Sequence, residues 1–171
     1  MIEKLPRYVL IFVLLLASQV LVFNRLHISG FFNAYPYVLF LLLLPSDVNR
    51  ALLLLIAFTM GITVDIFSDA GGIHAAACVP IAYLRHVMLR STTSLESKND
   101  SFEPNIHYFG LRSYLVYAGV LVFVHHTIVS FLEVFEFSHV FRTFLKAIGS
   151  TLFTLLFMVL IQYIFFKKKE K

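Results

Sequence analysis

Three positions at regular spacing interrupt a long apolar segment of this sequence, and they are the first candidates for specific chemistry. The pattern is Gly61-x3-Asp65-x3-Asp69. Residues four apart are neighbours on a helix surface, so the pattern predicts that all three lie near one helix face. On insertion scales a charged side chain at the centre of a bilayer costs about 2.5–3.5 kcal/mol, so Asp65 is expected to have a partner.

Further polar residues are expected at the depth of Asp65, on what we predict to be the outer side of a membrane. Asp65 or Glu133 can pair with Lys146 or Arg142 there. In one interpretation Asp65 hydrogen-bonds the tight turn that follows it, and Glu133 pairs with Lys146 for packing. In the other, the cluster lines a pocket or receives a partner. The candidate partner-binding or structural residues are Gly61, Asp65, Asp69, Gly72, His74, Glu133 and Lys146.

Residues that would support catalysis or metal binding do not occur in a recognisable arrangement. His125 and Glu133 are eight positions apart and can share a helix face, whereas His126 points about 100° away. We therefore expect one histidine to be buried by hydrogen bonding and the other to be exposed. The sequence has no HExxH motif, no Gly-rich phosphate loop and no GxSxG motif. We predict no enzyme activity, no metal and no cofactor.

The elements that position these residues follow from composition. Of the 171 residues, 59% are hydrophobic and 14% are charged, whereas a soluble domain has about 45–50% apolar and about 25% charged residues. The excess falls in long blocks, and a helix needs about 20 apolar residues to cross a bilayer. The sequence predicts one all-α integral membrane domain, a polytopic bundle of six transmembrane helices. The predicted spans are residues 8–26, 34–44, 50–67, 73–88, 113–135 and 142–166, with a cytoplasmic loop at 90–112.

Two of these spans need separate arguments. The first resembles a signal peptide, but its apolar run exceeds the usual length of about 7–15 residues and no small-x-small cleavage site follows, so we interpret it as a retained span. The second, residues 34–44, is too short to cross as a straight helix. Either Phe31 and Phe32 extend it, or it is a tilted or re-entrant element.

The basic residues predict the orientation of the chain. With six spans and an internal N-terminus, 11 of the 14 lysines and arginines lie in cytoplasmic segments, and only Arg25, Arg142 and Lys146 lie outside. This asymmetry follows the positive-inside rule and places both termini in the cytoplasm. Topology thus accounts for the net charge of +4, and we expect no nucleic-acid binding.

Small residues mark the predicted third and fourth spans. Ala57-x3-Gly61 on one span and Ala75-Ala76-Ala77 on the other would let the two helices approach closely. Close packing drives helix association in lipid, so we expect these spans to form the tight centre of the bundle. Cys78, the only cysteine, adjoins the alanines and is expected to be buried.

The segment around these spans resembles the bacterial rod shape-determining protein family MreD. The resemblance begins at Pro36-Tyr37-Val38 and continues through Pro45 and its polar turn. It is most specific in GITVDIFSDAGGIHAAA, residues 61–77, which contains the family-like Gly61-x3-Asp65 and the later Gly72. The other spans agree with the family in layout, size and a basic tail.

The resemblance implies a non-catalytic scaffold of the bacterial cytoplasmic (inner) membrane that takes part in cell elongation and peptidoglycan synthesis. It implies a fold similar to the S component of energy-coupling factor transporters. The implied partners are an MreC-like periplasmic coiled-coil protein, MreB, RodA and a class B penicillin-binding transpeptidase, together with the lipid bilayer. The alternative hypothesis is a small-solute-binding membrane subunit of a transporter, which the S-component-like architecture suggests.

Overall fold

The computed structural model describes residues 5–25, 32–92, 101–134 and 140–166. The elements follow in the order α1 (Leu5–Ser18), the π-helix η2 (Gln19–Phe23), α2 (Val38–Leu43), α3 (Arg50–Ser68), α4 (Ile73–Thr92), α5 (Ile106–Phe109), α6 (Leu111–Val134) and α7 (Val140–Phe165). The predicted all-α class is therefore confirmed for the described part of the chain.

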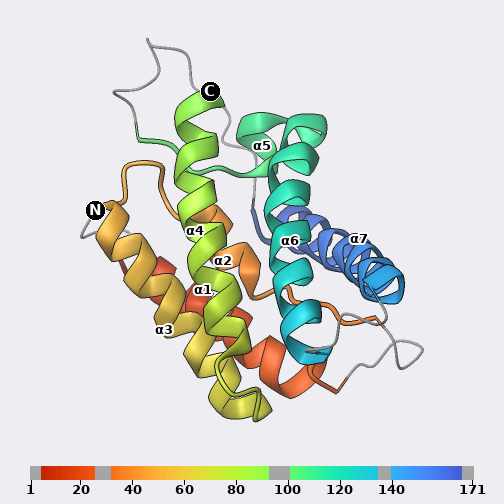
Figure 1. Ribbon diagram of the computed structural model, residues 1–171. Coiled ribbons are helices and arrows are strands. Elements are labelled where there is room, and N and C mark those ends of the chain that lie inside the picture. Colours follow the sequence, from red (N-terminus) through yellow and green to blue (C-terminus); the bar gives the residue numbers. More distant parts are fainter. Residues whose placement is uncertain (1–4, 26–31, 93–100, 135–139, 167–171) are drawn as a thin grey trace.

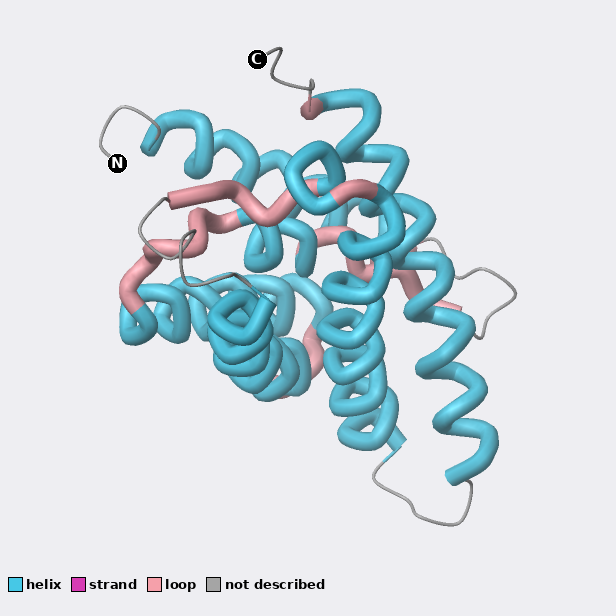
Figure 2. The backbone as a smooth tube through the Cα atoms, turned by 90° about the horizontal axis from the view of Figure 1, so that it is seen from above, coloured by secondary structure: helices cyan, strands magenta, loops and turns pink. Residues whose placement is uncertain are grey.

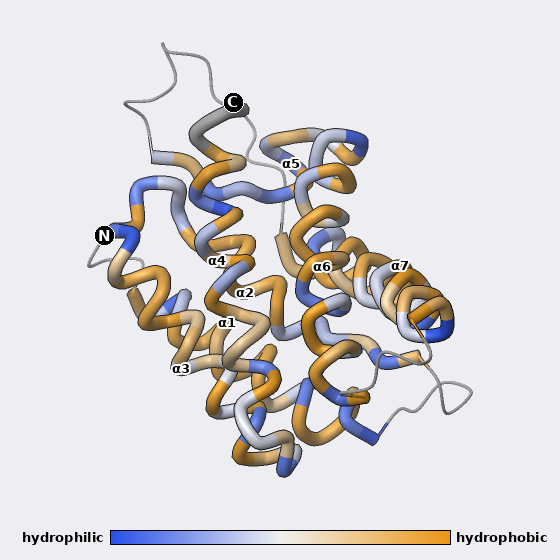
Figure 3. Tube along the Cα trace, in the orientation of Figure 1, coloured by the Kyte–Doolittle hydropathy of each residue, from blue (hydrophilic) through white to orange (hydrophobic). Residues whose placement is uncertain are grey.

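Four helical segments are long and apolar enough to cross a membrane, namely Leu5–Phe23, Arg50–Ser68, Leu111–Val134 and Val140–Phe165. The apolar part of α4, Ile73–Leu89, is somewhat shorter. The helix bodies are mostly hydrophobic, and hydrophilic residues gather at helix ends and in connecting segments (Figure 3). Many large apolar side chains on α1, α3 and α7 are exposed, as surfaces that face lipid are. These features support a multi-pass membrane protein.

The centre of the bundle is the antiparallel pair of α3 and α4, which lie side by side (Figure 1). α6 packs on the other side of α4, and α7 packs against α6. Ala57, Gly61, Ala77 and Cys78 are fully or almost fully buried between these helices. The predicted close approach of the third and fourth spans and the predicted burial of Cys78 are both confirmed.

The segment predicted as the second span has a different form from a transmembrane helix. Its only helix is α2, whose six residues are all buried and rise about 9 Å, far less than the roughly 30 Å of a hydrocarbon core. Phe32 does not extend it, because residues 33–35 have no helical structure. Pro45 explains the other end, since the residue before a proline is driven out of the helical region, and Leu44 has an extended ψ of 146°.

Side chains of the surrounding helices satisfy the exposed backbone of this buried segment. Before α2, the Asn33 amide donates to Ser150 Oγ at 3.1 Å and the Tyr35 amide to Thr154 Oγ1 at 3.0 Å. After it, the Tyr117 hydroxyl donates to the Leu42 carbonyl at 3.2 Å. Non-helical backbone is tolerated at membrane depth only where protein groups replace water in this way. Connecting segments accordingly run between the long helices (Figure 2).

Arg85 supplies further hydrogen-bond donors at the C-terminal end of α2. It is buried, with 1% of its surface exposed, and its guanidinium donates to the carbonyls of Leu44 and Pro45. The C-terminal end of a helix carries partial negative charge, which favours a cation there. Arg85 was counted among the cytoplasmic residues that set topology, but its contacts are internal to the bundle.

The predicted loop at residues 90–112 is shorter in the structure. α4 continues to Thr92, the four-residue helix α5 lies within the loop, and α6 begins at Leu111. Residues 93–100, including the predicted polar stretch around Lys98, lie outside the described residues. The Phe102 amide donates to Ser46 Oγ at 3.1 Å, so the described end of this loop packs against the turn after α2.

Replacing Arg85 tests its role in holding α2. Arg85→Met keeps an unbranched apolar side chain but leaves the Leu44 and Pro45 carbonyls without their donor. Because unsatisfied buried polar groups cost about 1–3 kcal/mol each, we expect a loss of about 2 kcal/mol or more, measured by thermal unfolding in detergent. Arg112→Met, at an exposed arginine at the start of α6, is the matched control. Equal stability of the two variants would contradict this role.

Candidate functional site

The Asp65 carboxylate, near the end of α3, binds the beginning of α4. Oδ1 accepts a hydrogen bond from the His74 amide and Oδ2 accepts one from the Ala75 amide, each at 2.9 Å. Oδ1 also lies 3.0 Å from His74 Nδ1. Asp65 and His74 are 3% and 4% exposed. The first amides of a helix lack intrahelical partners, so Asp65 acts as a cap supplied by the neighbouring helix. The predicted hydrogen bonding of the turn by Asp65 is present.

Gly61 lies one turn before Asp65 at the closest approach of the two helices. A Cβ atom there would lie 2.6 Å from the Ala75 nitrogen and 2.8 Å from the His74 carbonyl oxygen. These atoms are backbone and cannot move aside without shifting α4. The glycine therefore sets the separation at which Asp65 reaches the amides of α4.

The turn between α3 and α4 holds two further predicted residues, Asp69 and Gly72. Asp69 ends α3 in the left-handed conformation, with φ of 50°, and its amide donates to the Asp65 carbonyl. Gly72 has φ of 96°, a value that side-chain-bearing residues rarely adopt. The Asp69 side chain is exposed. Asp69 and Gly72 therefore shape the turn and are not part of the buried contact between Asp65 and His74.

Tyr35 connects the α3–α4 pair to the remaining predicted residues. Its ring contacts that of His74 edge-on, with centroids 5.0 Å apart, and stacks on His126, also at 5.0 Å. Its hydroxyl donates to Glu133 Oε1 at 3.5 Å. Glu133 Oε2 in turn accepts from Lys146 Nζ at 2.5 Å, so the predicted pair of α6 and α7 is formed. We call Asp65, His74, Tyr35, His126, Glu133 and Lys146 the polar cluster.

A second set of buried groups adjoins the polar cluster deeper in the bundle. The Tyr37 hydroxyl and His125 Nε2 are 2.8 Å apart. Cys78 Sγ lies 3.6 Å from the same hydroxyl. His126 Nε2 lies 2.8 Å from Thr154 Oγ1, the hydroxyl that also receives the Tyr35 amide.

The expectation that one of the two histidines is exposed is wrong. His125 and His126 are 0% and 1% exposed. They point in different directions, but α6 is flanked by α4 on one side and α7 on the other. Both directions therefore lead into protein.

The geometry of the described residues favours a role in helix packing. No three or more of their His, Cys, Asp and Glu side chains are placed to hold a metal ion. Among the described buried groups, His74 Nε2 and His125 Nδ1 have no hydrogen-bond partner, and the centroids of these two rings are 6.5 Å apart. The arrangement joins α3, α4, the segment before α2, α6 and α7 through hydrogen bonds and ring contacts.

Sequence reasoning identified Asp65, His74, Glu133 and Lys146 but missed the residue that joins them, Tyr35. It also missed Gln19, which is fully buried in η2 and donates to the Ala34 carbonyl at 3.3 Å and to Asn24 Oδ1 at 2.9 Å. An available signal was the Tyr-Pro-Tyr sequence at 35–37, two hydroxyl-bearing rings beside a helix-breaking proline in an apolar block. The sequence also places Glu136 and His139 on the predicted outer side of the membrane, and both fall outside the described residues.

Comparison of the chain with models of protein families, with curated proteins and with solved structures finds no match. The resemblance to the MreD family therefore remains a prediction from residues 61–77 and the layout of the spans.

The approach of α3 and α4 can be tested at Gly61. Gly61→Ala forces the helices apart, and we expect a loss of about 1–3 kcal/mol, as in overpacked cores. Gly119→Ala on α6 is the matched control, because its Cβ would meet only Leu155 Cδ1 at 3.8 Å. That substitution should be neutral or stabilise by up to about 1 kcal/mol. Thermal unfolding of both variants in detergent measures the difference, and similar shifts would refute the packing argument.

The cap can be tested at Asp65. Asp65→Ala leaves the amides of His74 and Ala75 buried without an acceptor, and we expect a loss of about 2–4 kcal/mol. Asp69→Asn removes a nearby acidic group at an exposed position and keeps a residue that tolerates the left-handed conformation, so it should change stability little. Urea or thermal unfolding in detergent gives both values. A mild effect of Asp65→Ala would show that water or another group replaces the carboxylate.

Proposed function

We propose that this protein is a non-catalytic, multi-pass scaffold of the bacterial cytoplasmic membrane that takes part in cell elongation. It acts through contacts with an MreC-like periplasmic coiled-coil protein and, in the same complex, with MreB, RodA and a class B penicillin-binding transpeptidase. The observation that carries the proposal is the segment 61–77, which resembles the MreD family. In the fold this segment is the α3–α4 contact around Gly61 and Asp65, where the two helices approach to backbone distance.

The geometry supports a scaffold because the distinctive residues are used to fix helix positions. The Asp65 carboxylate accepts from two backbone amides of α4 and contacts His74. Glu133 and Lys146 bind each other across α6 and α7 and keep 29% and 22% of their side-chain surface exposed. A rigid bundle with a partly exposed charged pair near the α6–α7 connection is suited to binding a partner outside the membrane.

We further propose six passages through the membrane with both termini in the cytoplasm. Segments predicted to be cytoplasmic meet one another at one end of the bundle. Arg7 pairs with Glu103 at 3.3 Å, the Ser46 amide donates to the Phe102 carbonyl at 2.9 Å, and His107 Nε2 lies 2.5 Å from the Phe166 carbonyl oxygen. The predicted outer connections meet as well, since Asn24 Nδ2 donates to Ser68 Oγ at 2.8 Å. In this arrangement residues 33–45 make the second passage as a non-helical segment and a turn followed by α2.

A second candidate function is that of a small-solute-binding subunit of a transporter. The observation in its favour is the pair of buried ring nitrogens without partners, His74 Nε2 and His125 Nδ1. Unsatisfied polar groups that converge at one depth are typical of a small-molecule site. The scaffold remains the better supported proposal, because the other polar atoms around these two rings already have protein partners.

Co-purification from native membranes distinguishes the two functions. The tagged full-length chain is extracted in mild detergent, and the proteins and small molecules that remain with it are identified by mass spectrometry. For a scaffold we expect an MreC-like chain with other elongation proteins. The packing variant Gly61→Ala should recover less of these partners than the control Gly119→Ala. A stoichiometric small solute or ATPase subunits, without elongation proteins, would replace the scaffold proposal by the transporter one.

A further inference from the structure

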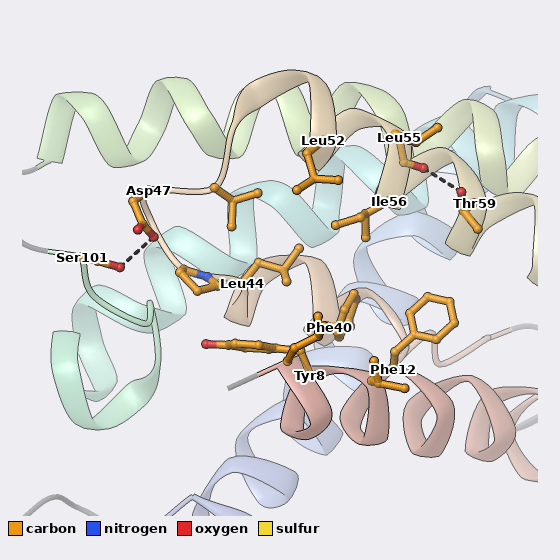
Figure 4. A pocket seen from close by; sticks show the side chains of 14 residues that line it. Tyr8, Phe12, Phe40, Leu44, Asp47, Leu52, Leu55, Ile56, Thr59 and Ser101 are labelled. Carbon is orange, nitrogen blue, oxygen red and sulfur yellow. Dashed lines mark hydrogen bonds between the residues drawn. The ribbon is translucent and has the colours of Figure 1, made fainter. Parts of the chain in front are cut away.

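An apolar groove of about 580 Å³ lies between α1 and α3, with α2 and the turn after it as the floor (Figure 4). Tyr8 and Phe12 line it from α1, Phe40 and Leu44 from α2, and Leu52 and Leu55 from α3. The volume is typical of sites that bind small organic molecules, which measure about 300–1,000 Å³. Val9, also in the lining, is 54% exposed and Leu55 is 61% exposed, so the groove is open along the side of the bundle.

The groove is shorter than one leaflet of a bilayer. Its lining extends from Leu5 to Phe12 on α1 and from Leu52 to Thr59 on α3, each about 10 Å at 1.5 Å per residue. Half of a hydrocarbon core of about 30 Å is about 15 Å. Beyond this depth η2 packs against α3 and Asn24 binds Ser68, so the two helices meet. A full transmembrane helix of a partner would need about three times this length, whereas the groove covers about two thirds of the depth of one leaflet and can hold most of an acyl chain.

The mouth of the groove is polar and acidic. Asp47 and Ser101 lie at this end, and the Ser101 hydroxyl donates to Asp47 Oδ1 at 2.7 Å (Figure 4). Asp47 is the one charged residue of the described lining, and it is exposed. The described cations nearby are directed elsewhere. Arg7 pairs with Glu103 and lies over the Phe166 ring, and Arg50 lies over the Tyr83 ring at 4.2 Å.

We propose that the groove binds one phospholipid of the adjacent leaflet, with an acyl chain along α1 and α3 and an ammonium headgroup against Asp47. The phosphatidylethanolamine headgroup has the required chemistry, because its ammonium can bond both the carboxylate and the Ser101 hydroxyl. An anionic headgroup such as that of phosphatidylglycerol would instead bring a net negative charge to a carboxylate. The inference rests on the proposed membrane insertion of the chain and is independent of the role in elongation.

Native mass spectrometry of the full-length protein in detergent tests this site. Delipidated protein is titrated with phosphatidylethanolamine or phosphatidylglycerol of identical acyl chains, and the fraction with one bound lipid is measured. We expect phosphatidylethanolamine to bind about three- to fivefold more tightly, the range for one interfacial charge pair. Asp47→Asn should remove this preference, whereas Asp69→Asn, at the far end of α3, should retain it.

A second pair of variants tests the groove itself. Val9→Trp places a large ring in the groove and should reduce binding of both lipids at least about threefold. Leu10→Trp, at an exposed neighbour outside the lining, should leave it unchanged. Equal binding of the two lipids to the unmodified protein, or binding unaffected by Val9→Trp, would overturn the proposal.

Co-purification separates this inference from the proposed function and from a protein occupant. If Val9→Trp abolishes recovery of a membrane protein while no lipid is retained by the unmodified chain, the groove belongs to a partner helix and the lipid proposal is wrong. Selective lipid binding without elongation partners would leave the lipid site in place and count only against the scaffold.

Discussion

The register of the bundle depends on the contact between one carboxylate of α3 and the first amides of α4. Asp65 reaches the amides of His74 and Ala75 because Gly61, one turn earlier, lets α4 approach to backbone distance. In an apolar environment these amides have no water to bind, so separating the helices would leave the carboxylate and two N–H groups unsatisfied together. The same contact positions the His74 ring against Tyr35, and through Tyr35 it determines where α6 and α7 can lie.

The buried segment 33–45 places a second constraint on the same helices. Non-helical backbone and a six-residue helix satisfy only part of their own carbonyls and amides, so further donors and acceptors must come from α4, α6 and α7. Arg85, Tyr117 and Thr154 supply them. The position of each of these side chains is restricted, because the donor–acceptor distance of a hydrogen bond can vary by only a few tenths of an ångström. These polar residues inside the bundle thus replace the water that the segment would otherwise require.

The sequence predicted the parts of this structure that depend on length and local spacing. The four long apolar helices follow from the number of apolar residues needed to cross a bilayer, and the Asp65 cap follows from its position before a tight turn. The Glu133–Lys146 pair could be predicted because the two residues lie at similar depth on consecutive spans. By contrast, the role of Tyr35 depends on which side chains of three other helices surround it. The burial of His126 depends on the packing of α7 on α6. The role of Tyr35 and the burial of His126 could therefore not be predicted from the spacing of residues within one segment.

The contrast between the two sides of the molecule explains why a groove exists beside α1. α3, α4, α6 and α7 share a continuous polar and apolar interior, whereas Leu15 is the one buried residue of α1. α1 is instead held near its two ends, by Arg7 and Tyr8 on Glu103 and by the Asn24–Ser68 bond beyond η2. Between these points Phe12 packs edge-on against Phe40 of α2, but the groove separates the facing side chains of α1 and α3. A gap of this kind forfeits dispersion contacts on both walls. An acyl chain restores them, so occupancy of the groove and the packing of α1 must be coupled, and lipid composition at the mouth becomes a determinant of how firmly the first helix is held.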